Sequence, residues 1–266
     1  MAISVGGIIY AKTGKLLLPE TALDSWQQWN GELRSRPVIL GPLSGGRSNH
    51  SFLLDSDGYR MVLRLNGTDA LLPGANRSTE TTIWQAASEA GIAPPLLHVD
   101  KQNRFLISTY INNSLSPRPD EEFVDQAFSL LKQCHQLKVV APTINYANHI
   151  EQYWKILENK THLLNTDLAE QREPMRELLE ALINSGTPTC LCHHDPVVAN
   201  FVGNANRLYL IDWEYAAHGL QVMDYAALSF EWGIDDAVVI ERTGVELELL
   251  VMAKNFYKYL CALWAA

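Results

Sequence analysis

The spacing of apolar residues changes part-way along the chain, and this change limits the possible folds more than any other feature. Between residues 37 and 111, apolar residues fall in short runs separated by turn residues, a pattern typical of β-strands. One longer segment, residues 76–90, has helical spacing and stops at Gly91 before a pair of prolines. Strands this close in sequence are joined most simply by antiparallel hairpins. The first part therefore predicts about five antiparallel strands and one main helix.

The remainder of the chain, from residue 119, is mainly helical in pattern. Its apolar residues recur with a period near that of an α-helix, as in Phe123, Ala127 and Leu130. Pro174 must start or kink one of these helices, because proline lacks the backbone N–H. Strand-like runs interrupt the pattern over residues 189–216. The expected helices cover residues 120–137, 146–164, 168–185, 220–233 and 246–265.

These patterns predict an α+β protein with two lobes. We expect a small β-rich N-lobe over residues 1–110, with a further helix in residues 18–33, and a larger helical C-lobe over residues 119–266. Residues 111–118 are polar and rich in turn formers, so we interpret them as a hinge or linker. Ligand sites are common between lobes of this kind.

Composition is that of an ordinary soluble protein. The 266 residues are 47% hydrophobic and 19% charged, and no run is long enough to span a membrane. The N-terminus has no basic segment before its apolar run, and the few cysteines do not make a disulfide framework, so we expect a reduced, cytoplasmic setting. The net charge of −9 disfavours a nucleic-acid partner and suits a cationic small substrate, although solubility alone also explains it. The sequence does not predict an oligomeric state.

Residues 191–212 carry the most specific chemical pattern. Asp195 and Asn200 lie in a loop between two strand-like runs, and Asp212 ends the next run. This spacing is the arrangement that phosphoryl-transfer enzymes with a kinase fold use. A carboxylate at Asp195 would accept the proton of a substrate hydroxyl. Oxygen atoms of Asn200 and Asp212 would bind Mg²⁺, a cation that prefers oxygen ligands. His193 would pack beneath the loop.

Other interpretations of the same residues are weaker. An Asp-x4-Asn pair is common in turns, where both residues bend the backbone. Four zinc ligands, Cys190, Cys192, His193 and His194, are also conceivable. However, a Cys-x-Cys strand puts both thiols on one face and His193 on the other, and no second ligand pair follows downstream. No feature marks either thiol as a nucleophile.

The N-terminal part supplies elements that suit a nucleotide. Residues 41–54 form a strand, a glycine-containing turn and a strand, and such a turn lets backbone N–H groups approach phosphate oxygens. Arg64 lies inside the next strand-like run, where a charged side chain needs a partner. Glu80 on the following helix is the best candidate, since a strand cation paired with a helix glutamate positions ATP phosphates in kinases.

Taken in order, these segments resemble the choline kinase and aminoglycoside phosphotransferase superfamily of small-molecule kinases. The resemblance rests on LSGGRSN, VLRLNG, RSTE, GIAPPLLHVD, LLKQCHQL, CHHDPVVANF and LIDWEYAAHGLQVMDYA, which cover most of the chain. LIDWEYA and the arginine at position 64 are more similar to the choline- or thiamine-kinase branch than to the aminoglycoside enzymes. The resemblance implies a two-lobed protein-kinase-like fold and phosphorylation of the hydroxyl of a small, cationic metabolite.

The resemblance also implies the cofactors ATP and Mg²⁺ and a set of site residues, with Asp195 as the catalytic base. Nucleotide would be bound by Ser44, Gly45, Gly46, Arg47, Ser48, Asn49, Arg64, Glu80, Ser108, Tyr110 and Ile111. The metal ligands would be Asn200 and Asp212, the substrate-binding residues Trp213, Glu214, Tyr215 and Trp232, and the supporting residues His193 and Asp224. The partner would be a small-molecule alcohol such as choline, ethanolamine or thiamine, with no nucleic acid and no membrane. An antibiotic phosphotransferase and a silent nucleotide-binding pseudokinase are the alternatives.

Three positions depart from the family's pattern. Pro196 stands where an apolar residue such as leucine is usual, and it favours an extended conformation at Asp195. Ala199 replaces a common glycine, and His194 fills a position that is often glycine or asparagine. None of these changes removes a side chain that the chemistry needs.

Overall fold

The computed structural model forms two compact units. The first comprises the described residues of Met1–Leu71 and Pro94–Tyr110, and the second those of Leu72–Ala93 and Ile111–Ala266. The residues described are 18–29, 33–43, 49–67, 77–113, 120–158, 166–204 and 206–266. The first unit ends at Tyr110, and residues 77–89, which form a helix, group with the second unit. The functional roles expected of residues 1–110, 111–118 and 119–266 stay predictions.

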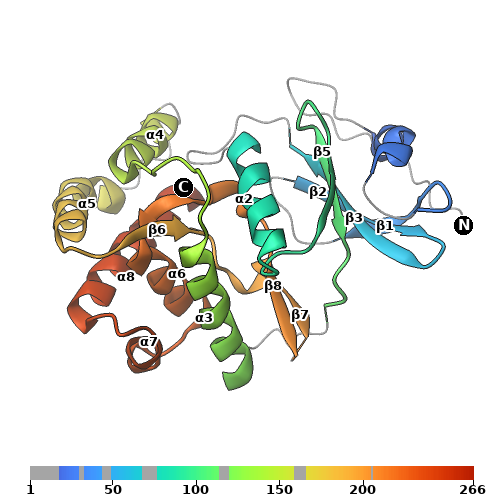
Figure 1. Cartoon of the computed structure of the whole chain (residues 1–266). Coiled ribbons are helices and arrows are strands. Elements are labelled where there is room, and N and C mark those ends of the chain that lie inside the picture. Colours follow the sequence, from blue (N-terminus) through green and yellow to red (C-terminus); the bar gives the residue numbers. More distant parts are fainter. Residues whose placement is uncertain are drawn as a thin grey trace, which may run out of the picture. The chain divides into compact units, whose positions relative to one another are not determined.

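An antiparallel sheet makes up most of the first unit, as predicted (Figure 1). Its strands are β1 Val38–Leu43, β2 Asn49–Ser56, β3 Tyr59–Asn66, β4 Leu96–Val99 and β5 Phe105–Thr109. They pair in the order β1-β2-β3-β5-β4. Asp57 and Gly58 connect β2 to β3 with φ angles of 53° and 87°, values that an Asp-Gly hairpin turn tolerates. Proline at position 42 lies on the edge strand β1, a position in a sheet where proline is tolerated.

The core of the first unit lies against this sheet. Leu54, Met61 and Ile107 are fully buried in one apolar cluster, which α1 (Pro19–Ala22) and the 3-10 helix η1 (Leu23–Gln28) help to cover. The helix expected over residues 18–33 is thus short. Ser25 donates a side-chain hydrogen bond to the Ala22 carbonyl at 3.0 Å, a local bond that competes with regular helix.

Helices and two short sheets build the second unit (Figure 1). The helices are α2 Arg77–Glu89, α3 Glu121–Gln136, α4 Tyr146–Glu158, α5 Thr166–Asn184, α6 Gln221–Trp232, α7 Asp236–Thr243 and α8 Leu247–Ala265. Asp120 caps α3 by accepting the Phe123 N–H at 2.9 Å. Pro174 lies inside α5 rather than at its start. The expected helices are present, and α7 is an additional one.

The helix α6 is the centre of this unit. All of its residues from Val222 to Ser229 are buried, and it packs against α8 and the strand β6 (Thr189–Cys192). β6 pairs with β9 (Ala217–Leu220), and β7 (Phe201–Asn204) pairs with β8 (Arg207–Leu210). The predicted interruption by strands over residues 189–216 is confirmed, whereas β9 was not expected. β6 and α6 together support the loop that holds Asp195.

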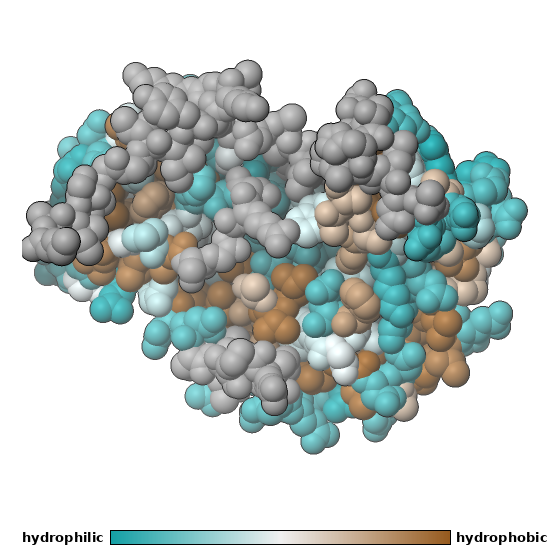
Figure 2. Space-filling view, turned by 180° about the vertical axis from the view of Figure 1, so that it is seen from behind, coloured by the Kyte–Doolittle hydropathy of each residue, from teal (hydrophilic) through white to brown (hydrophobic). Residues whose placement is uncertain are grey.

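The surface carries several large exposed apolar side chains. On the side drawn in Figure 2, brown hydrophobic groups are interspersed with teal hydrophilic ones. The large exposed apolar side chains include Val38 and Leu40 on β1 and Leu247 and Val251 on α8. Such residues are ordinary on soluble domains. Among the described residues, no helix has the length and apolar character needed to cross a membrane.

Candidate active site

The predicted catalytic loop follows β6 and turns sharply at Pro196. The Val197 N–H donates to the Asp195 carbonyl at 2.9 Å, which closes a three-residue turn with proline at its centre. The peptide bond before Pro196 is trans, and the proline is buried. The fixed φ of proline suits this turn, so the departure from the family's usual residue is compatible with the loop. The chain then enters the short 3-10 helix η2 (Val198–Asn200) and continues into β7.

Asp195 and Asn200 meet directly. The Asn200 Nδ2 group donates to both the backbone carbonyl and the carboxylate Oδ2 of Asp195, each at 2.8 Å. These bonds hold the carboxylate in place. Both use the Nδ2 group of Asn200, so the amide oxygen takes no part in them. Burial and the charge of Asp212 raise the pKa of Asp195 to about 7, while the hydrogen bond from Asn200 opposes the rise. A carboxylate with a pKa near neutrality is suited to accept a proton at physiological pH.

Asp212 follows β8 and is close enough to influence Asp195 electrostatically. It adopts a left-handed conformation, with φ 65° and ψ 66°, before the 3-10 helix η3 (Trp213–Tyr215). Non-glycine residues in this region carry backbone strain and are concentrated at functional sites. The neighbouring Ile211 N–H donates to the Asn200 carbonyl at 2.9 Å, which ties the end of β8 to η2. A carboxylate and an amide oxygen are therefore both present here, and this donor set fits Mg²⁺.

Asp224 lies beneath the loop and is completely buried. Its carboxylate accepts the backbone N–H groups of His193 at 2.9 Å and His194 at 2.8 Å, the two residues before Asp195. It also meets His135 Nε2 at 2.8 Å. Burial alone would raise the pKa of Asp224, but the hydrogen bond and charge of His135 lower it to about 2. An ionised Asp224 thus holds the loop from below, the contact pattern expected of a supporting residue.

The two loop histidines have different surroundings. His193 is buried, its Nε2 lies 3.0 Å from the Ile211 carbonyl, and its ring packs edge-on against Trp213 at 4.9 Å. His194 has a positive φ of 66°, which accounts for the glycine or asparagine that the family often has there. Its Nε2 lies 2.9 Å from the Tyr146 hydroxyl. Burial lowers the pKa of both histidines, so both rings are neutral.

Several contacts around the loop have no short sequence motif and were not predicted. Tyr146 also accepts the Leu220 N–H at 3.1 Å, so one hydroxyl links the His194 ring to β9. A Cβ at Gly219 would come 2.5 Å from both His194 Nε2 and the Tyr146 hydroxyl, so only glycine leaves room for this pair. These residues lie far apart in sequence, and packing alone brings them together.

The residues expected to bind the acceptor differ in burial and in their hydrogen bonds. Trp213 is fully buried, and its indole N–H donates to the Leu210 carbonyl at 3.1 Å, which favours a structural role. Tyr215 and Trp232 are half-buried, and burial raises the pKa of the Tyr215 phenol, which stays neutral. The Trp232 indole N–H donates to the Pro196 carbonyl at 2.9 Å. Acceptor binding by Tyr215 and Trp232 stays a prediction.

Glu214, the fourth of these residues, is part of an ion-pair cluster. Arg77 Nη1 lies 2.8 Å from Glu214 Oε2 and 3.1 Å from Glu80 Oε2. Both glutamates are almost fully buried. The cluster joins the start of α2 to η3 within the second unit. Glu80 therefore has a cation on its own helix, and its expected pairing with Arg64 stays a prediction.

The other expected nucleotide-binding residues are only partly described. Ser44–Ser48 lie outside the described residues. Asn49, Arg64 and Ser108 are buried in the sheet of the first unit, and the Tyr110 N–H donates to the Arg60 carbonyl at 3.2 Å. Ile111 is half-buried. Their binding of nucleotide stays a prediction.

Comparison with known proteins shows the family to which the chain belongs. Residues 40–247 match the Phosphotransferase enzyme family. The chain belongs to this family. It is 28% identical over 196 residues to thiamine kinase of Shigella boydii and 25% identical over 190 residues to protein LicA of Haemophilus influenzae. These alignments cover 71% and 69% of this chain, but only 65% and 56% of the two relatives.

The fold has a matching solved structure. Choline kinase LicA from Streptococcus pneumoniae superposes with a TM-score of 0.70 at 20% identity, over 85% of each chain. At this identity the likeness shows the shared fold. The expected α+β, protein-kinase-like fold and the resemblance to the choline kinase and aminoglycoside phosphotransferase superfamily are confirmed.

Replacing Trp232 by phenylalanine tests the support of Pro196. The variant loses the hydrogen bond to the Pro196 carbonyl but keeps a ring that can pack on Phe123 and Phe201. The smaller ring alone should lower the free energy of unfolding, measured by urea denaturation. We expect the lost hydrogen bond to lower it by about 1 kcal/mol more. Trp26→Phe is the control, because the Trp26 indole N–H has no hydrogen-bond acceptor within the described ranges. Equal losses in the two variants would contradict the expectation.

Proposed function

We propose that the chain is an ATP- and Mg²⁺-dependent phosphotransferase that phosphorylates the hydroxyl of a small, cationic metabolite of the choline, ethanolamine or thiamine class. The observation that carries this proposal is the pair Asp195–Asn200 beside Asp212, with the pKa of Asp195 raised to about 7. Membership of the phosphotransferase family supports the reaction type. The names of the relatives supply the acceptor class.

In the proposed mechanism, Asp195 accepts the proton of the acceptor hydroxyl as that oxygen attacks phosphorus. Asn200 orients the carboxylate through its Nδ2 group, and Asp224 fixes the loop backbone. Asn200 Oδ1 and the Asp212 carboxylate would hold Mg²⁺, which when bound neutralises charge on the transferring phosphate. Residues 44–49 with Arg64 would bind the nucleotide phosphates through backbone N–H groups and the guanidinium.

A cationic acceptor suits the electrostatics of the second unit. Asp212, Glu231 and Glu214 all raise the pKa of Asp195, so negative charge accumulates around the proposed base. The half-buried rings of Tyr215 and Trp232 lie on elements next to it, and ring faces attract ammonium-type groups. A positively charged substrate would relieve this repulsion. An uncharged sugar alcohol would not.

The test is a coupled assay of ADP release with the purified full chain, ATP and Mg²⁺. Choline, ethanolamine and thiamine are compared with an aminoglycoside and with an uncharged alcohol such as glycerol, and mass spectrometry identifies the phosphorylated product. We expect turnover with one of the cationic metabolites. Turnover restricted to the aminoglycoside would favour the antibiotic phosphotransferase. ATP binding without transfer to any acceptor would favour the pseudokinase.

Asp212→Asn tests the proposed metal site. Loss of the carboxylate is expected to raise the Mg²⁺ concentration for half-maximal activity by about 100-fold or more, because even outer-shell changes cost 10- to 100-fold in metal affinity. In the metal-free protein the same change should lower the pKa of Asp195, since the Asp212 charge is one of its causes. Activity titrations and carboxylate NMR measure the two effects. An unchanged Mg²⁺ requirement would remove Asp212 from the site.

A further inference from the structure

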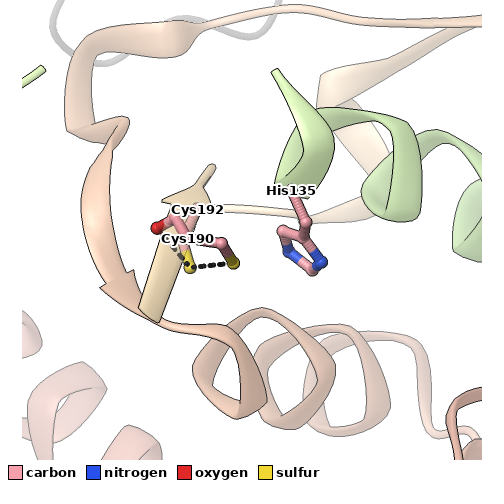
Figure 3. Close-up of side chains that lie close together, drawn as sticks. All are labelled: His135, Cys190 and Cys192. Carbon is pink, nitrogen blue, oxygen red and sulfur yellow. Dashed lines mark hydrogen bonds between the residues drawn. The ribbon is translucent and has the colours of Figure 1, made fainter. Parts of the chain in front are cut away.

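A second group of potential ligands lies behind the catalytic loop. Cys190 and Cys192 extend from the same face of β6, and His135 reaches them from the last turn of α3 (Figure 3). The two sulfur atoms are 3.8 Å apart. The ligand atoms of all three residues lie within 4.8 Å of one another. The sequence showed the two thiols but not the histidine, which lies on a helix far upstream.

The spacing of these atoms fits a tetrahedral soft-metal site. Two thiolates bound to one zinc ion at ~2.3 Å lie ~3.8 Å apart in a tetrahedron, and the Sγ–Sγ distance here is 3.8 Å. The Sγ–Sγ distance therefore already matches such a site, and a ring nitrogen of His135 lies within 4.8 Å of both sulfurs. Two sulfur ligands and one nitrogen ligand favour Zn²⁺ over Mg²⁺ or Ca²⁺, which require oxygen donors.

The surroundings of His135 also match those of a metal ligand. Its Nε2 meets the ionised Asp224 carboxylate at 2.8 Å, so Nε2 carries the ring proton. A carboxylate behind a histidine is the usual partner that orients a metal-bound imidazole. The other nitrogen, Nδ1, meets only the amide of Gln221, at a longer 3.3 Å, within the described part of the chain. A metal ion can displace that weak bond.

The two thiols differ in how readily they ionise. The hydrogen bond from Cys192 and the charge of His135 lower the pKa of Cys190, against the effect of burial. Burial raises the pKa of Cys192. Cys190 is half-buried and Cys192 is buried, so an ion would enter from the Cys190 side. Binding would release the thiol protons to solvent, as it does at other cysteine sites.

We propose that His135, Cys190 and Cys192 form a zinc-binding site with a fourth position open to water or a small ligand. The site is separate from the Mg²⁺ ligands proposed above. It is linked to the catalytic loop, because Asp224 bonds both His135 and the backbone of His193. Occupancy would therefore stiffen the loop from behind.

The experiment uses the full chain, reduced and freed of metal by a chelator. Zn²⁺ affinity is measured by competition with a chromophoric chelator, and Co²⁺ serves as the spectroscopic probe. We expect one ion per chain, intense d–d bands of tetrahedral Co²⁺ and a thiolate charge-transfer band. Cys190→Ser should weaken Zn²⁺ binding by about 10-fold or more. Cys261→Ser is the control, because Cys261 lies on α8 beside Glu231.

Alkylation provides an independent readout if Cys190→Ser fails to fold. In the wild-type chain, Zn²⁺ should slow alkylation of Cys190 but leave Cys261 unaffected, as mapped by mass spectrometry. Sub-stoichiometric binding, octahedral Co²⁺ spectra or equal affinity in Cys190→Ser would overturn the proposal. A Cys190–Cys192 disulfide that forms in air, with no metal bound by the reduced protein, would overturn it in favour of a redox-active pair.

Discussion

Asp195→Asn is expected to lower kcat by about 10²- to 10⁴-fold, the usual contribution of a positioned general base. Asparagine keeps the size of the side chain but cannot accept the proton of the acceptor hydroxyl. The Asn200 Nδ2 group would still have the Asp195 backbone carbonyl as an acceptor, so the loop should keep its turn. Steady-state ADP release with the acceptor identified by the screen measures the effect.

Two controls separate loss of the base from loss of the fold. ATP affinity, measured by calorimetry, should change little in Asp195→Asn, since the nucleotide-binding residues are proposed to lie elsewhere. Asp57→Asn makes the same chemical change in the exposed β2–β3 turn, where asparagine tolerates the positive φ. It should retain wild-type activity. Activity in Asp195→Asn within a few-fold of the wild-type value would exclude Asp195 as the base.

Local sequence patterns predicted most of the fold. The turn residues Asp57 and Gly58 and the short β-like runs on either side of them predicted β2 and β3. The helical spacing of Phe123, Ala127 and Leu130 specified α3, and these residues are buried as expected. In each case the signal lies within a few residues. Strands and helices with a strong local sequence pattern can thus be predicted without knowledge of tertiary contacts.

Elements that depend on tertiary contacts were missed or misjudged. β9 is a strand only because Ala217–Leu220 pairs with β6, and it contains a glycine that no strand pattern favours. Pro174 does not start a helix but lies inside α5, which continues on both sides of it. The loss of one backbone hydrogen bond there is small compared with the packing of the whole helix.

Some contacts of the candidate site could likewise be predicted from local sequence, and others could not. Asp195 and Asn200 were recognised from their spacing, because a short loop between strands brings them together. Arg77 reaches Glu214, and His135 reaches Asp224, from distant parts of the chain. No local pattern encodes such pairs. The sequence disfavoured a zinc site at Cys190 and Cys192 because His193 lies on the other face of the strand and no second ligand pair follows, whereas His135 approaches the thiols from a distant helix.

Asp224→Asn is expected to lower the free energy of unfolding by about 3–5 kcal/mol at pH 7, the usual cost of removing one member of a buried charged pair. The variant keeps the side-chain shape but loses a carboxylate that accepts the N–H groups of His193 and His194. Burial lowers the pKa of His135 while the hydrogen bond and charge of Asp224 raise it, so the pKa of His135 should fall in the variant. Urea denaturation in buffer with a chelator measures the stability.

The dependence on pH identifies the cause of that loss. The folded-state pKa of Asp224 is lowered to about 2, so its contribution is present above the ordinary carboxylate pKa and is lost as the pH falls towards 2. The stability difference between wild type and variant should therefore shrink as the pH falls from about 5. Asp236→Asn is the control, because its half-buried ion pair with Lys254 should contribute only about 1 kcal/mol or less. If the two variants lose equal stability, or if the difference does not change with pH, Asp224 does not act as the buried charge that holds the catalytic loop.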